Sequence, residues 1–363
     1  MAWRFGWIVL VVACLAPSAR AQDNPEFTHP EAIRAAIDEF IVPAYADFAV
    51  GSKTLRKTLD GLCRAPSPTA LTGARAAFAE TVSSWSTAEI VRFGPAITLG
   101  RMERIAFWPD RKGIGARHLR RALRNRDPAL LAPGALQHKS AALQGLTALE
   151  MLLHGKRADQ LATPDEKDRY ACALAAAIAA NLVSISERIL AEWIRTDPFR
   201  TYMLEPGFHN PYFRDSNSVP ATLLSSFAQM LEAIRDKKLL LALGRGDARP
   251  RPRRTQWWRS GLGAKSLRAN FVAIKLLYAA SGWKRFMPDA SAQAAALVES
   301  DLERAILLVS GLHKPLDRAI LDETDRQKLL QLAAIARTLQ TLTSEETAKA
   351  LGVVLGFSWV DGD

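Results

Sequence analysis

The chain has 363 residues, which at roughly 150 residues per domain predicts about two domains. Hydrophobic residues make up 48% and charged residues 23%, a globular composition that excludes intrinsic disorder and a protein of many membrane spans. The 48 Lys and Arg against 37 Asp and Glu give a net charge of +11, which raises nucleic acid or an anionic surface as a partner. Three cysteines are too few for a disulfide scaffold and lack metal-finger spacing.

Residues 1–21 have the pattern of a signal peptide for export. Arg4 supplies a positive start, Trp7 to Ala16 form a short apolar run, and Ala19 and Ala21 frame a small-x-small cleavage site. The apolar run is too short to span a bilayer, which disfavours the alternative of an uncleaved anchor. A lipoprotein is also disfavoured, because Cys14 lies inside the apolar run without the upstream leucine. We therefore expect a periplasmic or otherwise exported protein.

Cleavage after Ala21 changes both the charge and the cysteine count. It removes two arginines and no acid, so 46 basic against 37 acidic residues leave +9. The remaining Cys63 and Cys172 are expected to form a disulfide, because an exported chain reaches an oxidising compartment. The alternative is two buried thiols.

The rest of the chain predicts helices almost throughout. Apolar residues recur at helical spacing, Pro43 should kink or break the first helix, and Thr163 and Pro164 form a helix start. No alternating run with hairpin turns predicts a strand. The expected helices lie at about 30–45, 69–91, 136–154, 163–195, 219–243, 264–280, 290–310, 322–341 and 343–354. The fold class is thus all-α, as tandem up-down bundles over 22–200 and 201–363 with a hinge at 197–217.

The helix expected at 136–154 carries a carboxylate on its apolar stripe. Glu150 is in register with Leu146 and Leu153, so it should be buried, and a buried charge needs a cation, a metal or hydrogen-bond partners. Thr147 lies one turn before it and His154 one turn after. Glu150, with His154, is the candidate metal site. The alternatives are a structural Glu–Arg pair and a His154 that only complements the helix C-terminus.

Several stretches together resemble one family. The segment Gly145-Leu146-Thr147-Ala148-Leu149-Glu150 is similar to the GxHxxE motif of the imelysin family. Further similar stretches lie at 92–95, 101–104, 107–110, 258–261 and 355–363, in a consistent order over most of the mature chain. The resemblance implies an exported bacterial helical protein associated with iron uptake, with a site at the junction of two four-helix bundles. Gly145 and Glu150 carry over directly.

One position departs from the motif. Thr147 stands where the family has His, and a threonine hydroxyl is a poor replacement for an imidazole as a transition-metal ligand. The sequence therefore leaves open whether iron or another divalent metal is the cofactor. The resemblance does not imply that this member holds the same metal.

Two further segments contain candidate ligand-binding residues. Arg101, Trp108 and Asp110 could line a cleft with Glu150, or could form an ion-pair network that fixes a loop. The element Trp258-Arg259-Ser260 could bind an anion or line the cleft, since arginine offers a planar fork of donors. Its alternative is a capping and packing element.

Two arginine-rich stretches account for the net charge. The run at 245–259 lies beside two tryptophans, but an exported chain without a nucleic-acid motif predicts a solvated loop and no nucleic-acid partner. The stretch at 111–126 could contact an anionic membrane surface or an acidic partner. No catalytic fingerprint of a hydrolase or nucleotide-binding protein is present.

The sequence thus predicts a non-enzymatic, imelysin-like protein of iron or metal acquisition. It would bind a metal, a metal chelate or an envelope protein of a metal-uptake system in the cleft between its bundles. Glu150 is the principal candidate residue, with Thr147, Arg101, Asp110 and Arg259 as lesser ones. A peptidase-like metalloenzyme and an interaction module that docks on an anionic surface are the alternatives.

Overall fold

The structure is a computed structural model that describes residues 30–194, 198–244 and 249–355. These residues form helices joined by turns and contain no strand, which confirms the all-α prediction. The expected signal peptide at 1–21 and the motif-like ending at 356–363 lie outside the described residues.

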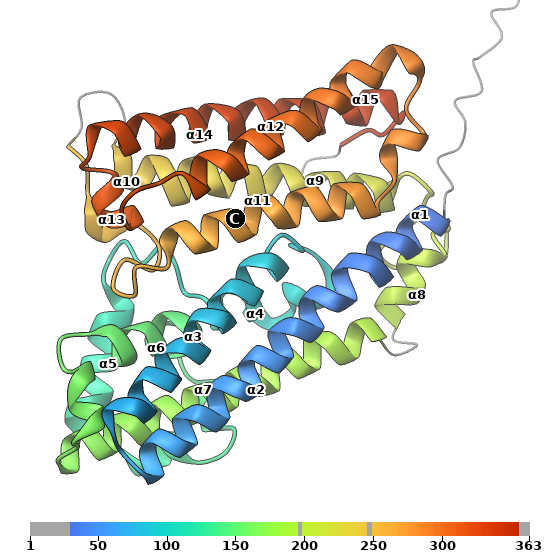
Figure 1. Cartoon of the computed structure of the whole chain (residues 1–363). Coiled ribbons are helices and arrows are strands. Elements are labelled where there is room, and N and C mark those ends of the chain that lie inside the picture. Colours follow the sequence, from blue (N-terminus) through green and yellow to red (C-terminus); the bar gives the residue numbers. More distant parts are fainter. Residues whose placement is uncertain (1–29, 195–197, 245–248, 356–363) are drawn as a thin grey trace, which may run out of the picture.

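The N-terminal half is built on three long helices. Helix α2 packs against both α3 and α7, and the shorter helices α5 and α6 lie beside them toward one end (Figure 1). The helices of this half are α1 (Pro30–Ala35), α2 (Val42–Arg64), α3 (Pro68–Ala88), α4 (Arg101–Ile105), α5 (Ile114–Asn125), α6 (Gly145–His154) and α7 (Glu166–Ile194). Cys63 of α2 and Cys172 of α7 are joined by a disulfide, so it links two of the long helices.

Apart from its first helix α8, which packs against α1 and α7 of the first layer, the C-terminal half forms a second layer of helices on top of the first (Figure 1). Its helix α11 packs along α3 and joins the two halves. The helices of this half are α8 (Pro198–Leu204), α9 (Ser218–Glu232), α10 (Leu241–Leu243), α11 (Gly263–Ala280), α12 (Ala292–Ser310), α13 (Leu316–Ala319), α14 (Glu323–Thr341) and α15 (Ala348–Ala350). Wide π-helical turns at Ala233–Leu240 and Leu342–Thr347 continue α9 into α10 and α14 into α15.

Helix α7 is long and apolar enough to meet the length and hydropathy criteria for a membrane span. In its most apolar window the mean hydropathy is 1.5, and 56% of that window is buried inside the protein. The helix packs against α2 and α6, and residues such as Leu174, Ile178 and Leu182 are fully buried. This burial explains its composition as that of a core helix.

Three expectations about helix boundaries need correction. The first helix does not break at Pro43, because the wide turn Ala36–Ile41 precedes the proline and accommodates its missing N–H. The helix expected at 136–154 begins only at Gly145, after short 3₁₀ turns. Helix α7 begins at Glu166 instead of after Thr163, and the Asp165 side chain accepts the hydrogen bond from the Asp168 N–H.

A sealed polar cluster lies where the two halves meet. Lys238, in the π-helical turn after α9, donates hydrogen bonds to the carboxylate of Glu89 and, at 2.7 Å, to Asn270 Oδ1. Asn270 in turn donates to Glu89 Oε1 and to the Ser86 carbonyl, both at 2.6 Å. All three charged or amide side chains are nearly inaccessible to solvent. Each has a partner, so the cluster fixes α11 and the turn after α9 to the end of α3.

Candidate functional site

The carboxylate of Glu150 lies on the buried face of α6, as the stripe predicts. Only 2% of the residue is exposed, and its partners come from the segment just before α11. Its Oε1 atom accepts hydrogen bonds from the Arg259 and Ser260 N–H groups, both at 3.1 Å, and from the Ser260 hydroxyl at 2.8 Å. Glu150 therefore connects the N-terminal half to the C-terminal half.

The charge on Glu150 is only partly compensated. Burial raises the pKa of Glu150, against the opposing effects of the Ser260 hydrogen bonds and the Arg259 charge. The Arg259 guanidinium lies 3.8 Å from Glu150 Oε2. Burial disfavours its charged form too, and so lowers the pKa of Arg259. The same guanidinium stacks 4.3 Å from the ring centre of Trp258. Arg259 is thus held by an aromatic face and a weak ion pair together.

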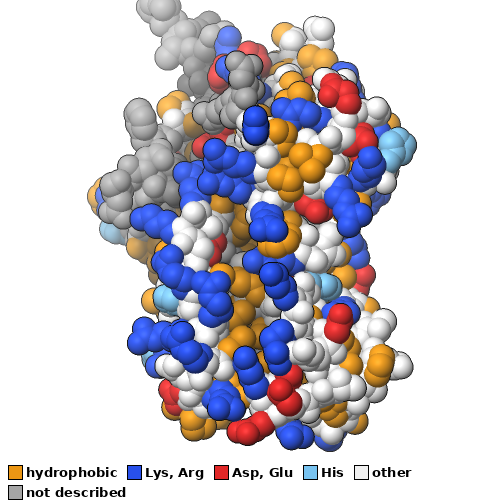
Figure 2. Space-filling model, turned by 90° about the vertical axis from the view of Figure 1, so that its left-hand side faces the viewer, with side chains coloured by type: hydrophobic (Ala, Val, Ile, Leu, Met, Phe, Trp, Pro, Cys, Tyr) orange, Lys and Arg blue, Asp and Glu red, His pale blue; other side chains and the backbone are white. Residues whose placement is uncertain are grey.

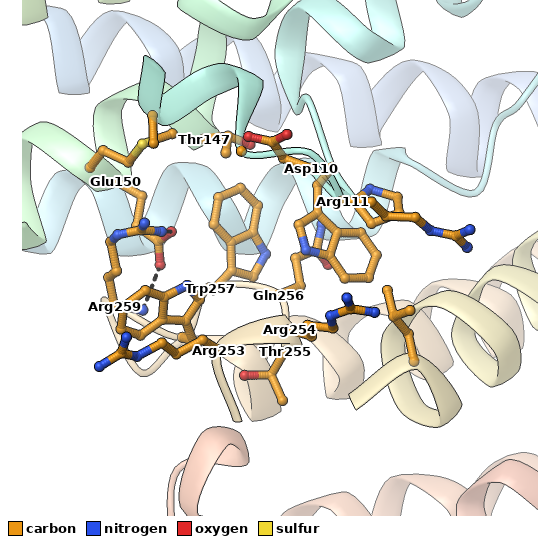
Figure 3. A pocket seen from close by; sticks show the side chains of 17 residues that line it. Asp110, Arg111, Thr147, Glu150, Arg253, Arg254, Thr255, Gln256, Trp257 and Arg259 are labelled. Atoms are coloured by element: carbon orange, nitrogen blue, oxygen red, sulfur yellow. Dashed lines mark hydrogen bonds and ion pairs between the residues drawn. The ribbon is translucent and has the colours of Figure 1, made fainter. Parts of the chain in front are cut away.

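A pocket of about 160 Å³ opens beside Glu150, between the two halves. In Figure 3, Thr147, Glu150 and Asp110 approach it from the N-terminal half, and Arg253, Arg254 and Thr255 approach from the opposite side. The pocket is also lined by Trp108, Arg111, Gln256, Trp257, Trp258 and Arg259. The pocket therefore exists only where α5, α6 and the 253–259 segment are brought together.

Gly145 serves the packing of α6. Its backbone has φ +66°, and a Cβ there would lie 2.2 Å from the carbonyl oxygen of Ile105. Only glycine fits this close approach. Gly145 does not line the pocket, so its role is to fix the start of the helix that carries Thr147 and Glu150.

The predicted cleft residues separate into two groups. Trp108 and Asp110 line the pocket, and Asp110 accepts hydrogen bonds from the Ile114 N–H at 2.7 Å and the Gly115 N–H at 2.8 Å at the start of α5. Arg101 does not line it. Its guanidinium forms a bidentate ion pair with Glu192 at 2.6 and 2.7 Å, so it ties α4 to α7.

His154 lies one turn beyond Glu150 but outside the pocket. Its ring centre is 5.5 Å from that of Phe78, and its Nε2 atom has no hydrogen-bond partner among the described residues. Burial, assisted by Arg75, lowers the pKa of His154 to about 4. His154 is thus a neutral packing residue in this structure.

The residues at the pocket do not fit a directly coordinated metal. Glu150 Oε1 already accepts three hydrogen bonds, Arg259 lies beside Oε2, and Thr147 offers only a neutral hydroxyl that has no partner among the described residues. Nowhere in the described ranges do three His, Cys, Asp or Glu side chains gather in a way that could hold a metal ion. A cation here would face four arginines beside two carboxylates that already accept hydrogen bonds.

Sequence reasoning did not assign the pocket-lining roles of Arg253, Arg254 and Gln256. The arginine run suggested a solvated loop. Hydrophobic periodicity does not predict which side chains of an irregular segment are buried. The usable clue was the Trp-Trp-Arg sequence that follows, because two adjacent tryptophans cannot both be solvated at low cost. In the structure Trp257 is buried and Trp258 lies under Arg259.

Comparison with known proteins agrees with this architecture. The imelysin family model matches residues 41–344. The fold is similar to an imelysin-like protein from Psychrobacter arcticum 273-4, with a TM-score of 0.73 and 20% identity over 92% of this chain and 98% of that one. It is also similar to a putative iron-regulated protein A precursor from Parabacteroides distasonis ATCC 8503, with a TM-score of 0.74 and 14% identity over 92% of this chain and 97% of that one. Among curated proteins, no relative matches. The chain belongs to the imelysin family.

Proposed function

We propose that this chain is an exported, non-catalytic protein of bacterial iron acquisition that binds an iron-containing ligand between its two halves. The observation that carries the proposal is the pocket itself. It lies against the motif segment of α6 and is closed by the 253–259 segment of the other half, which is held by Glu150. A ligand bound there contacts both halves at once.

Two observations support the link to iron and export. One solved structure with the same fold bears the name of an iron-regulated protein A precursor, a description that belongs to that protein. The first 21 residues of this chain have the charge, apolar run and cleavage pattern of a signal peptide. Both features are consistent with a protein that handles iron in the cell envelope.

The chemistry of the pocket favours binding over catalysis. The described residues that line it include no histidine, cysteine or lysine. Asp110 and Glu150 accept hydrogen bonds from backbone N–H groups, so neither carboxylate is poised as a general base. The peptidase-like alternative would need a nucleophile or an activated water at this place.

Equilibrium dialysis of the purified mature protein tests the proposal. The protein is dialysed against radioactive ferric iron presented as a set of small soluble chelates, with an unrelated exported protein as the control. We expect iron to be retained at micromolar concentration in at least one chelate form and no cleavage of an unfolded protein substrate. Absence of retained iron in every form, or cleavage that a chelator abolishes, would contradict the proposal.

A second candidate function rests on the surface charge. Helix α5 exposes four arginines, and the face of the molecule that includes α5, α10 and α13 carries many Lys and Arg side chains (Figures 1 and 2). Those arginines are Arg117, Arg120, Arg121 and Arg124. This face could dock on an anionic membrane or an acidic envelope protein. Co-sedimentation with anionic vesicles that is lost at high salt, and not seen with neutral vesicles, would support it.

A further inference from the structure

The pocket contains more positive than negative charge. Four arginines line it, Arg111, Arg253, Arg254 and Arg259, against two carboxylates, Asp110 and Glu150. Both oxygens of Asp110 accept hydrogen bonds from the backbone at the start of α5, and Glu150 Oε1 accepts three. The acidic groups are thus already engaged, while the basic ones are in excess. An anion is the ligand that this balance attracts.

The arginines also retain unused donors. Arg254 is half-buried, yet among the described residues its side chain has neither a hydrogen bond nor an ion pair. Arg253 lies 5.8 Å from the ring centre of Trp258, on which Arg259 stacks. A guanidinium that stacks on an aromatic ring keeps its N–H edge free. Carboxylates match this edge because they accept two parallel hydrogen bonds from one guanidinium.

Three buried polar atoms next to these arginines also lack hydrogen-bond partners within the described part of the chain. They are Thr147 Oγ1, Gln256 Oε1 and Trp257 Nε1, and their residues are 9%, 5% and 2% exposed. A buried donor or acceptor without a partner costs free energy, and native proteins keep few of them. Hydroxyl and carboxylate oxygens of a ligand would supply acceptors and donors at this wall after small side-chain rotations.

The size of the pocket restricts the ligand further. A volume of about 160 Å³ is below the roughly 300–1,000 Å³ of sites for drug-sized molecules. A large chelator would not enter, whereas a compact molecule with several carboxylates would. Trp108, Trp257 and Trp258 also line the pocket, and a charge pair beside such apolar walls is stronger than one in bulk water.

We infer that the pocket recognises a small polycarboxylate through Arg253, Arg254 and Arg259, either as the free acid or as its iron complex. Recognition goes through the carboxylate oxygens, and the protein itself does not coordinate the metal. This inference rests on the proposed function for its iron-bearing form only. The exposed arginines of α5 lie on the neighbouring surface and raise the local concentration of such an anion.

Isothermal titration of the mature protein tests this inference with four probes: citrate, ferric citrate, inorganic phosphate and a ferric tris-hydroxamate that carries no carboxylate. The variant Arg254→Gln removes a pocket cation, and Arg120→Gln removes one charge from the exposed surface of α5 as the matched control. Thermal unfolding establishes that both variants are folded. We expect citrate and ferric citrate to bind and Arg254→Gln to weaken both at least about tenfold. Arg120→Gln should change them less than about twofold.

The possible outcomes separate this inference from the proposed function. Binding of the tris-hydroxamate without citrate would overturn the inference and leave the function standing. Binding of citrate with no iron form retained would leave the inference standing and contradict the function. Phosphate that binds as tightly as citrate, or equal effects of the two substitutions, would overturn the carboxylate assignment.

Discussion

Two buried carboxylates join the halves of this protein, and their surroundings differ. Glu89 pairs with Lys238 and Asn270 in a cluster where every charged or amide group has a partner and nothing opens to solvent. Glu150 pairs with backbone N–H groups and the Ser260 hydroxyl, beside a pocket and next to polar atoms that have no partner among the residues the structure describes. The first arrangement fixes the fold, whereas the second leaves binding capacity for a ligand.

The largest effect should come from breaking the sealed cluster. Lys238→Met leaves Glu89 buried without its cation, and we expect a loss of about 3–5 kcal/mol in the free energy of unfolding. Urea denaturation measures this loss. The double variant Glu89→Gln with Lys238→Met should recover most of it, because no lone charge then remains. A loss below about 1 kcal/mol in the single variant would show that the cluster is not structural.

His154, which lies just outside the pocket, should make the stability of the protein depend on pH. Its native pKa of about 4 lies below the ordinary value near 6.5, so only the unfolded chain takes up a proton between these values. Stability should therefore fall as the pH drops through this window, by about 2 kcal/mol after the shift is discounted for the partly exposed ring, with no further contribution below it. Urea denaturation at several pH values, compared with His154→Gln, isolates this contribution. An identical pH dependence in the variant would contradict the buried neutral state.

A smaller effect is expected from loosening the hold on Glu150. Ser260→Ala removes one of three donors to Oε1 and leaves the two backbone donors in place. We expect the free energy of unfolding to fall by about 1–2 kcal/mol, less than in Lys238→Met. The comparison is made by urea denaturation under the same conditions. An equal or larger loss in Ser260→Ala would mean that the two carboxylates do not differ as described.

Periodicity predicted much of this architecture because helices repeat their pattern. The same apolar stripe extends to Glu89, which caps the C-terminus of α3 one turn after the buried Trp85. The burial of Lys238 could not be predicted from helical periodicity, because a wide π-helical turn shifts the register around it.

The composition of the pocket could be predicted only in part. Trp108, Asp110, Thr147 and Glu150 were expected together and do line one cavity. Arg101 was expected among them, but its partner Glu192 is 91 residues away in the sequence, and no local pattern reports such a pair. Arg253 and Arg254 lie in an irregular segment, where tertiary contacts alone decide which side chains turn inward.

The central claim is that Glu150 positions a cationic pocket and does not bind a metal. The affinities of Glu150→Gln for citrate and ferric citrate test it most directly, because glutamine keeps an acceptor for the 259–260 backbone and removes the negative charge. We predict that both ligands bind as tightly as to the wild type or tighter, by up to about tenfold. Weaker binding of either ligand, and above all a selective loss of ferric citrate, would contradict the account.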